Sequence, residues 1–391
     1  MSEELYENPE ENLEEILAER KKRKKKGITL WKAVRRILLC VFTLILCVVI
    51  AVFSALHTVI NGECEPLRDK LVLSAMQASA TKWLPALFLP QEKVDEIVAS
   101  SYETNTDVMS LEEYTSLNKG EDAVITEDKW DNAVDGMIFE TIRSDNFTGY
   151  VLLVKDPSRL YVGTSSDFTR NEVGMHIFDM AEKEDAIAII NGGEYFDPGG
   201  MGEGNNPMGV TYSKGNCVWN DHASRTFMGF DKNNKLIVTE PMTKAQADKL
   251  GIRDGVCFQN GNVLITNEDG NITIHYADKN TGTAQRTAIG QTADGTVILL
   301  VTDGRSASSL GATKNDVIDV MVKYGAISAG MLDGGSSSMM YYEDYFHKYN
   351  YDTQALDQYQ LKGIVNKYKA FTTPRLMPTF FCVARETEAE G

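Results

Sequence analysis

Apolar and polar residues follow three different patterns along the chain. An uncharged apolar run extends from Ile37 to Ile60, and as a helix it would be about 36 Å long, enough to cross a hydrocarbon core of about 30 Å. Residues 61–100 have helical spacing, with Trp83 either at a membrane interface or packed on the next domain. Residues 101–125 are polar and acidic with few large apolar side chains, which predicts a linker.

From about residue 126 the pattern changes to short apolar runs separated by Gly, Asn and Asp. Many strands, a few helices and no strict alternation between them predict an α+β domain with mixed β-sheets and a few flanking helices. We expect strands at Met137–Arg143, Tyr150–Lys155, Leu160–Thr164 and Ala186–Ile190, hairpins over 228–238 and 287–302, and helices at Glu172–Lys183, Thr243–Leu250 and Thr313–Tyr324.

Charge is distributed unevenly. The chain has 39 Lys and Arg against 56 Asp and Glu, a net charge of −17, while residues 1–36 are slightly basic. An acidic body argues against a nucleic-acid partner. Basic residues before the apolar run predict a single-pass protein of the cell membrane with a cytoplasmic N-terminus and an extracellular C-terminal domain. The basic segment and the apolar run are longer than in a cleaved signal peptide, so we expect a retained anchor.

These patterns divide the chain into four segments. We predict a basic cytoplasmic tail (1–36), a transmembrane helix (37–60), a membrane-proximal helical stalk and linker (61–125) and a globular domain (126–391).

Several familiar kinds of site are not supported by the sequence. Cys64, Cys217, Cys257 and Cys382 lie outside the predicted span, where they allow three disulfide pairings or free thiols. The five histidines form no metal-binding pair, so we expect no metal centre, although Asp197 and Glu203 lie in a glycine-rich loop that would suit Ca²⁺. No dinucleotide fingerprint, phosphate-binding loop or serine-hydrolase elbow is complete.

What remains is four polar clusters, each next to an apolar strand candidate. Such positions are where ligand sites occur on sheet-based folds. Each Asp-Gly or Asn-Gly pair is by itself an ordinary turn, but four clusters together favour a site. Arg286 lies in an apolar stretch, so its guanidinium needs an acidic or anionic partner, which a structural salt bridge to Asp303 or Asp333 would also supply. The clusters are residues 190–197, 285–290, 301–305 and 331–338.

The order of these motifs resembles the phosphodiester glycosidase family over roughly residues 137–386. The resemblance is carried by I-N-G-G ending at Gly193, R-T-A-I-G from Arg286, V-T-D-G-R ending at Arg305, S-L-G-A-T from Ser309 and L-D-G-G-S-S-S from Leu332, with a further echo around Arg375. Together, in this order, they are specific.

The resemblance implies hydrolysis of a sugar-1-phosphodiester at the glycosidic bond, with release of sugar and a phosphomonoester. Because phosphate leaves as a stable anion, guanidinium groups that bind phosphate matter more than a proton donor. The implied catalytic carboxylates are Asp333 first, then Glu194 and Asp303. The implied substrate-binding residues are Asn191, Gly192, Gly193, Arg286, Arg305, Gly334, Gly335, Ser336, Ser337 and Arg375.

We therefore expect a membrane-anchored extracytoplasmic hydrolase that acts on cell-envelope glycans or exopolysaccharide without a cofactor. One alternative is a non-catalytic glycan-binding module in envelope polysaccharide assembly. Another is a phosphoryl transferase with a nucleophile among Ser336–Ser338, which is weaker because no basic partner adjoins those serines in the sequence.

Overall fold

The structure is a computed structural model, and it divides into two compact units, Met1–Glu65 and Pro66–Gly391. The first unit contains helix α1 (Pro9–Ile60), a single helix of 52 residues. Its part from Trp31 to Ile60 is long and apolar enough to cross a membrane, a property that signal sequences share. The residues described are 9–77, 81–101, 104–117, 124–125, 127–169, 173–197, 202–278, 281–304, 309–349, 351–352, 354, 356–366 and 373–386.

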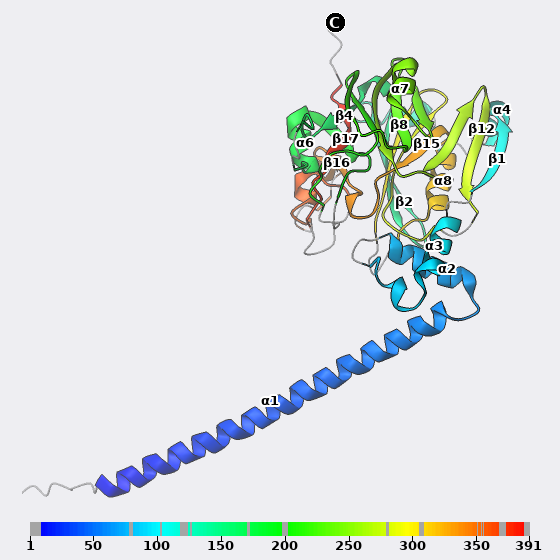
Figure 1. Ribbon diagram of the computed structural model, residues 1–391. Helices are drawn as coiled ribbons and strands as arrows, with labels where there is room; N and C mark the ends of the chain where they lie inside the picture. Colours follow the sequence, from blue (N-terminus) through cyan, green and yellow to red (C-terminus); the bar gives the residue numbers. More distant parts are fainter. Residues whose placement is uncertain are drawn as a thin grey trace, which may run out of the picture. The chain divides into compact units, whose positions relative to one another are not determined.

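The second unit is an α+β domain, as the sequence predicts, built on three sheets whose described pairings are antiparallel (Figure 1). The largest sheet has the order β1 (Thr104–Ser110), β12 (Asn271–Ala277), β11 (Val263–Glu268), β15 (Ala326–Leu332), β13 (Thr287–Thr292), β14 (Val297–Thr302), β3 (Thr148–Val154) and β2 (Met137–Arg143).

Two smaller sheets complete the second unit, and one apolar core joins all three. Phe230 and Phe381, one from each small sheet, meet edge to face within it. One small sheet is β7 (Asn216–Asn220), β6 (Val210–Ser213), β10 (Ile252–Phe258), β8 (Thr226–Asp231) and β9 (Leu236–Thr239); the other is β16 (Met340–Tyr342), β5 (Ala186–Asn191), β17 (Thr379–Ala384) and β4 (Leu160–Thr164).

Helices of the second unit start where the sequence supplies caps. Thr243 and Thr313 each accept a backbone N–H and form a capping box, at the starts of α7 (Lys244–Leu250) and α8 (Lys314–Lys323). The other helices are α2 (Glu65–Met76), α3 (Gln91–Ser100), α4 (Leu111–Leu117), α5 (Glu127–Trp130), α6 (Ile177–Glu184) and α9 (Tyr345–Lys348), with short 3₁₀ turns η1 (Pro85–Leu87), η3 (Pro157–Arg159), η5 (Gly335–Ser337) and η7 (Gln360–Lys362).

Residues 104–117 differ from the expected linker. Strand β1 pairs along the whole of β12 and forms an edge of the largest sheet (Figure 1). Tyr114 of α4 is fully buried and donates a hydrogen bond to the carbonyl of Ala326 at 2.7 Å. The segment is polar because β1 is an edge strand with exposed side chains, so its order comes from the β12 ladder rather than from apolar burial.

Two open questions from the sequence have clear structural answers. Trp83 is 61% exposed, so most of its side chain surface lies outside the apolar core. All six cysteines are free thiols, and Cys257 and Cys382 are buried.

Candidate active site

The ends of β5 and β15 meet through Asn191. This fully buried side chain donates from Nδ2 to the carbonyl of Asp333 at 2.7 Å. Its Oδ1 accepts the hydroxyl of Thr287 at 2.8 Å and the backbone N–H of Met339 at 3.0 Å. The backbone N–H of Asp333 also donates to the carbonyl of Gly192 at 3.2 Å. Asn191 therefore joins two predicted clusters that are far apart in the sequence, and its role here is to position Asp333.

Asp333 carries the most perturbed carboxyl group of this region. Burial raises its pKa from 3.8 to about 7, and the negative charge of Glu194 acts in the same direction. The hydroxyl of Ser337 and the charge of Arg375 oppose this rise without cancelling it. Ser337 is the last residue of the turn η5, which begins at the second of the paired glycines. A carboxyl group that exchanges its proton near neutral pH is suited to acid or base catalysis.

Arg375 is held beside Asp333 by two partners from the segment after β5. Its Nη1 donates to the hydroxyl of Tyr195 at 2.9 Å and to Oδ2 of Asp197 at 2.7 Å. Burial and the charge of Asp333 raise the pKa of Tyr195, while Arg375 opposes that rise. These observations place the phenol, the guanidinium and the Asp333 carboxyl group together at one location.

Glu194 is the second carboxylate near Asp333. Its Oε2 is buried and lies 2.9 Å from Nε of Arg225, an ion pair in which the N–H is not aligned for a hydrogen bond. Gln259 donates to Oε1 at 3.3 Å. Burial raises the pKa of Glu194, with Arg225 and then Gln259 acting against it. The negative charge of Glu194 opposes the ionisation of Asp333, and pairs of carboxyl groups with separated pKa values recur in glycosidase sites.

The paired glycines after β5 allow neighbouring strands to approach closely. A Cβ on Gly192 would lie 2.4 Å from Oγ1 of Thr379, and one on Gly193 would lie 2.2 Å from the carbonyl of Cys257. No side chain fits there. The two glycines therefore pack against β17 and β10, and their predicted contact with substrate stays a prediction.

Gly334 and Gly335 turn the chain between β15 and η5. The N–H of Gly335 donates to the carbonyl of Gln285 at 2.9 Å, and its φ of +64° is a conformation that favours glycine. Ser336 is exposed, whereas Ser337 is buried.

Arg286 directly precedes β13 and Asp303 directly follows β14, at the end of the largest sheet where β15 also ends. Arg286 is 6% exposed and donates to the carbonyls of Ala312 and Gly282, each at 3.1 Å, and to Oε1 of Gln77 at 3.3 Å. These contacts link its loop to α8 and α2. Asp303 accepts the hydroxyl of Tyr150 at 3.0 Å. Since β13 separates β14 from β15, we place Asp303 about 10 Å from Asp333 along the sheet.

Arg305 and the glycine-rich loop considered for Ca²⁺ were also candidates from the sequence. Arg305 lies outside the described residues. The carboxylate of Asp197, considered for Ca²⁺, accepts the N–H of Gly202 at 2.8 Å as well as the Arg375 hydrogen bond. Among the described residues no group of three or more His, Cys, Asp or Glu side chains could hold a metal ion.

Tyr195 and Arg225 belong to the site but were not predicted from the sequence. A signal that could have indicated Tyr195 is its spacing from Asp197. Residues two apart in an extended segment project to the same side, so the two side chains face the same way. Arg225 gave no local signal, since its partner Glu194 lies 31 positions away in the sequence.

A comparison with protein-family models identifies one family. The family model described as phosphodiester glycosidase matches residues 184–384, just over half of the chain. The SPbeta prophage-derived uncharacterized protein YomE of Bacillus subtilis (strain 168) is 28% identical over 192 residues, 47% of this chain and 27% of that protein. The chain thus spans about a quarter of the length of this curated relative.

Two solved structures resemble the chain at low sequence identity. The zebrafish N-acetylglucosamine-1-phosphodiester alpha-N-acetylglucosaminidase catalytic domain, described as auto-inhibited by its pro-peptide, has a TM-score of 0.46 and 15% identity, covering 72% of this chain and 88% of that one. A hypothetical protein from Synechocystis has a TM-score of 0.41 and 13% identity, covering 65% of this chain and 63% of that one.

Proposed function

Because the chain belongs to the phosphodiester glycosidase family, we propose that it hydrolyses a sugar-1-phosphodiester at the glycosidic carbon–oxygen bond and releases sugar and a phosphomonoester. The observation that carries this proposal is the convergence of Asp333, Glu194 and Arg375 within the matched residues. Two carboxyl groups and a guanidinium are the groups that such a reaction needs.

Arg375 is the group we assign to the phosphate. A phosphomonoester anion is a good leaving group, so stabilising its negative charge contributes more than protonating it. A guanidinium has five donors in a planar fork that matches phosphate oxygens. Nη1 donates the hydrogen bonds to both Tyr195 and Asp197, and these bonds hold the guanidinium in place before substrate binds.

Asp333 is the group we assign to the anomeric carbon, where in its ionised form it activates water or stabilises the developing positive charge. Because burial raises its pKa to about 7, the ionised fraction increases through neutral pH. The rate should therefore rise with pH around 7 and level off above it. Glu194, whose negative charge is partly balanced by Arg225, is the second carboxylate.

We place the reaction on the outer face of a cell membrane, with a cell-envelope glycan or exopolysaccharide as substrate. The support is the apolar part of α1, which is long enough to span a bilayer, preceded by a basic cluster from Arg20 to Lys26. An acidic outer domain that binds phosphate through one or two arginines would act on single diester groups rather than coat a polyanion.

A direct test uses the full chain in detergent micelles with a panel of synthetic sugar-1-phosphodiesters. Phosphorus NMR follows conversion of diester to monoester. We expect turnover by the wild-type chain and by Asp179→Asn, a control on the exposed face of α6. Asp333→Asn should be slower by about 10²–10³, the usual effect of losing a group that acts in the transition state. Saturable binding without any product would refute hydrolysis and favour the glycan-binding alternative.

A further inference from the structure

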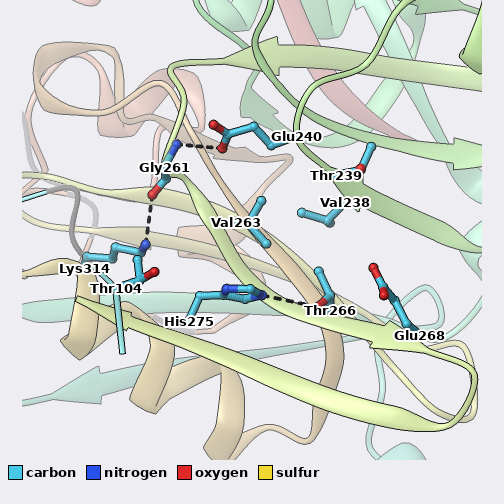
Figure 2. A pocket seen from close by; sticks show the side chains of 10 residues that line it. All are labelled: Thr104, Val238, Thr239, Glu240, Gly261, Val263, Thr266, Glu268, His275 and Lys314. Atoms are coloured by element: carbon cyan, nitrogen blue, oxygen red, sulfur yellow. Dashed lines mark hydrogen bonds between the residues drawn. The ribbon is translucent and has the colours of Figure 1, made fainter. Parts of the chain in front are cut away.

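A separate pocket of about 380 Å³ lies where two sheets approach each other (Figure 2). Its volume is within the range of small-molecule sites. It is built from β9, β11, β12, the first residue of β1 and the first residue of α8, and we call it the Lys314 pocket. Its lining residues are Thr104, Val238, Thr239, Glu240, Gly261, Val263, Thr266, Glu268, His275 and Lys314.

Lys314 is the unusual member of this lining. Its side chain is 5% exposed, and its ammonium donates to the carbonyl of Gly261 at 2.8 Å. Among the described residues no carboxylate forms an ion pair with it, and Glu240 acts on it only through space. Burial lowers the pKa of Lys314 to about 8, which reflects the cost of keeping this charge away from water.

The position in the helix makes this cost larger. Lys314 is the first residue of α8, and a cation at a helix N-terminus opposes the helix dipole. Both unfavourable effects would be offset by an anion in the pocket. A lysine kept here without such a ligand would contribute less to stability than an apolar residue of similar size.

The acidic residues of the lining do not prevent an anion from binding. Glu240 and Glu268 are exposed, so solvent and salt screen their charges, whereas the Lys314 ammonium is buried. Oε2 of Glu240 is also already hydrogen-bonded, by the hydroxyl of Thr226 and the N–H of Gly261, each at 2.7 Å. The Lys314 ammonium is therefore the charged group of the lining that water screens least.

The remaining walls suit a sugar ring. Figure 2 shows His275 next to Thr266, and the ring Nε2 lies 3.3 Å from the Thr266 hydroxyl. Burial and the nearby Lys314 lower the pKa of His275 and Glu268 acts against them, so the net effect favours the neutral imidazole, which is a hydrogen-bonding group. Two valines supply apolar surface for the ring faces, and two further hydroxyls come from Thr104 and Thr239.

We propose that the Lys314 pocket binds an anionic sugar residue, with its carboxylate or phosphate on the Lys314 ammonium and its hydroxyls toward His275 and the threonines. A polymeric substrate would then be held by one residue here while another enters the Asp333 site. This polymer-holding role rests on the proposed function, whereas binding of the anionic sugar does not.

The test measures binding of D-glucuronate to the full chain in detergent micelles by titration calorimetry. Lys314→Met removes the charge and keeps the length, and Lys323→Met, at the exposed opposite end of α8, is the matched control. We expect D-glucuronate to bind the wild-type chain and Lys323→Met alike and to bind Lys314→Met at least tenfold more weakly. D-glucose should also bind at least tenfold more weakly than D-glucuronate, and glucose 6-phosphate shows whether phosphate replaces carboxylate.

A second measurement needs no variant. Acylation of lysines in the wild-type chain, read by mass spectrometry, should slow at Lys314 when D-glucuronate is present and stay unchanged at Lys323. Absence of binding, or equal affinity and no protection of Lys314, would overturn the proposal. Lys314→Met should hydrolyse a small sugar-1-phosphodiester whose sugar is uncharged at the same rate as the wild type. If no variant hydrolyses any diester yet glucuronate binds through Lys314, the proposed function fails and the pocket assignment stands.

Discussion

Replacing Asp333 with Asn should change how stability depends on pH, and this change is independent of any substrate. A carboxyl group whose pKa is raised on folding favours the folded state at low pH, and this contribution is lost as pH rises through the folded-state pKa. For Asp333 that pKa is about 7, against 3.8 for the ordinary group. Linkage then gives a loss of about 2–3 kcal/mol in the free energy of unfolding between pH 5 and pH 8. Asp333 is partly exposed, so this is an upper figure.

Asn keeps the shape and can still accept the Ser337 hydroxyl, but it does not ionise. Thermal unfolding of the full chain in micelles at pH 5 and pH 8 measures the difference. Between pH 5 and pH 8 the melting temperature of the wild type should fall by up to about 5 °C more than that of Asp333→Asn. Asp179→Asn, an exposed replacement of the same kind, should follow the wild type. Parallel pH profiles for wild type and Asp333→Asn would refute the assignment of a raised pKa to Asp333.

Three further outcomes are expected. Arg375→Ala should lower turnover of a sugar-1-phosphodiester by about 10²–10³ in steady-state assays, and an unchanged rate would remove Arg375 from the site. Asn191→Ala should lower the free energy of unfolding by about 2–5 kcal/mol in urea titrations, because it leaves the buried Thr287 hydroxyl and Met339 N–H without their shared acceptor; a loss below about 1 kcal/mol would contradict the positioning role. A chain starting at residue 126 should melt well below one starting at residue 66, because it lacks β1 and the buried Tyr114, and equal melting temperatures would show that this segment is dispensable.

Local sequence signals predicted the elements that local chemistry determines. The turn between β13 and β14 and the helix start at Thr313 depend on Gly295 in a left-handed conformation and on a hydroxyl cap, and both can be recognised within a few residues. Strand β1 could not be recognised, because its exposed polar side chains carry no apolar pattern and its hydrogen bonds come from β12, over 160 residues later in the chain.

The candidate site shows the same division. Asp333 and Glu194 were identified from motifs at strand ends, and the structure places Glu194 close enough to raise the pKa of Asp333. The sequence does not show which arginine accompanies them. Arg375 lies close enough to Asp333 to lower its pKa, whereas Arg286 directs its guanidinium toward the end of α2 and the start of α8. That distinction depends on tertiary packing, since both arginines adjoin strands of similar apolar character.

The central claim is that water attacks the sugar carbon rather than phosphorus. Hydrolysis of a sugar-1-phosphodiester by the full chain in ¹⁸O-labelled water, with both products analysed by mass spectrometry, tests it directly. Cleavage of the glycosidic carbon–oxygen bond predicts ¹⁸O in the released sugar and none in the phosphomonoester. Label in the phosphomonoester, with an unlabelled sugar, would show attack at phosphorus and contradict the assignment of Asp333 to the anomeric carbon.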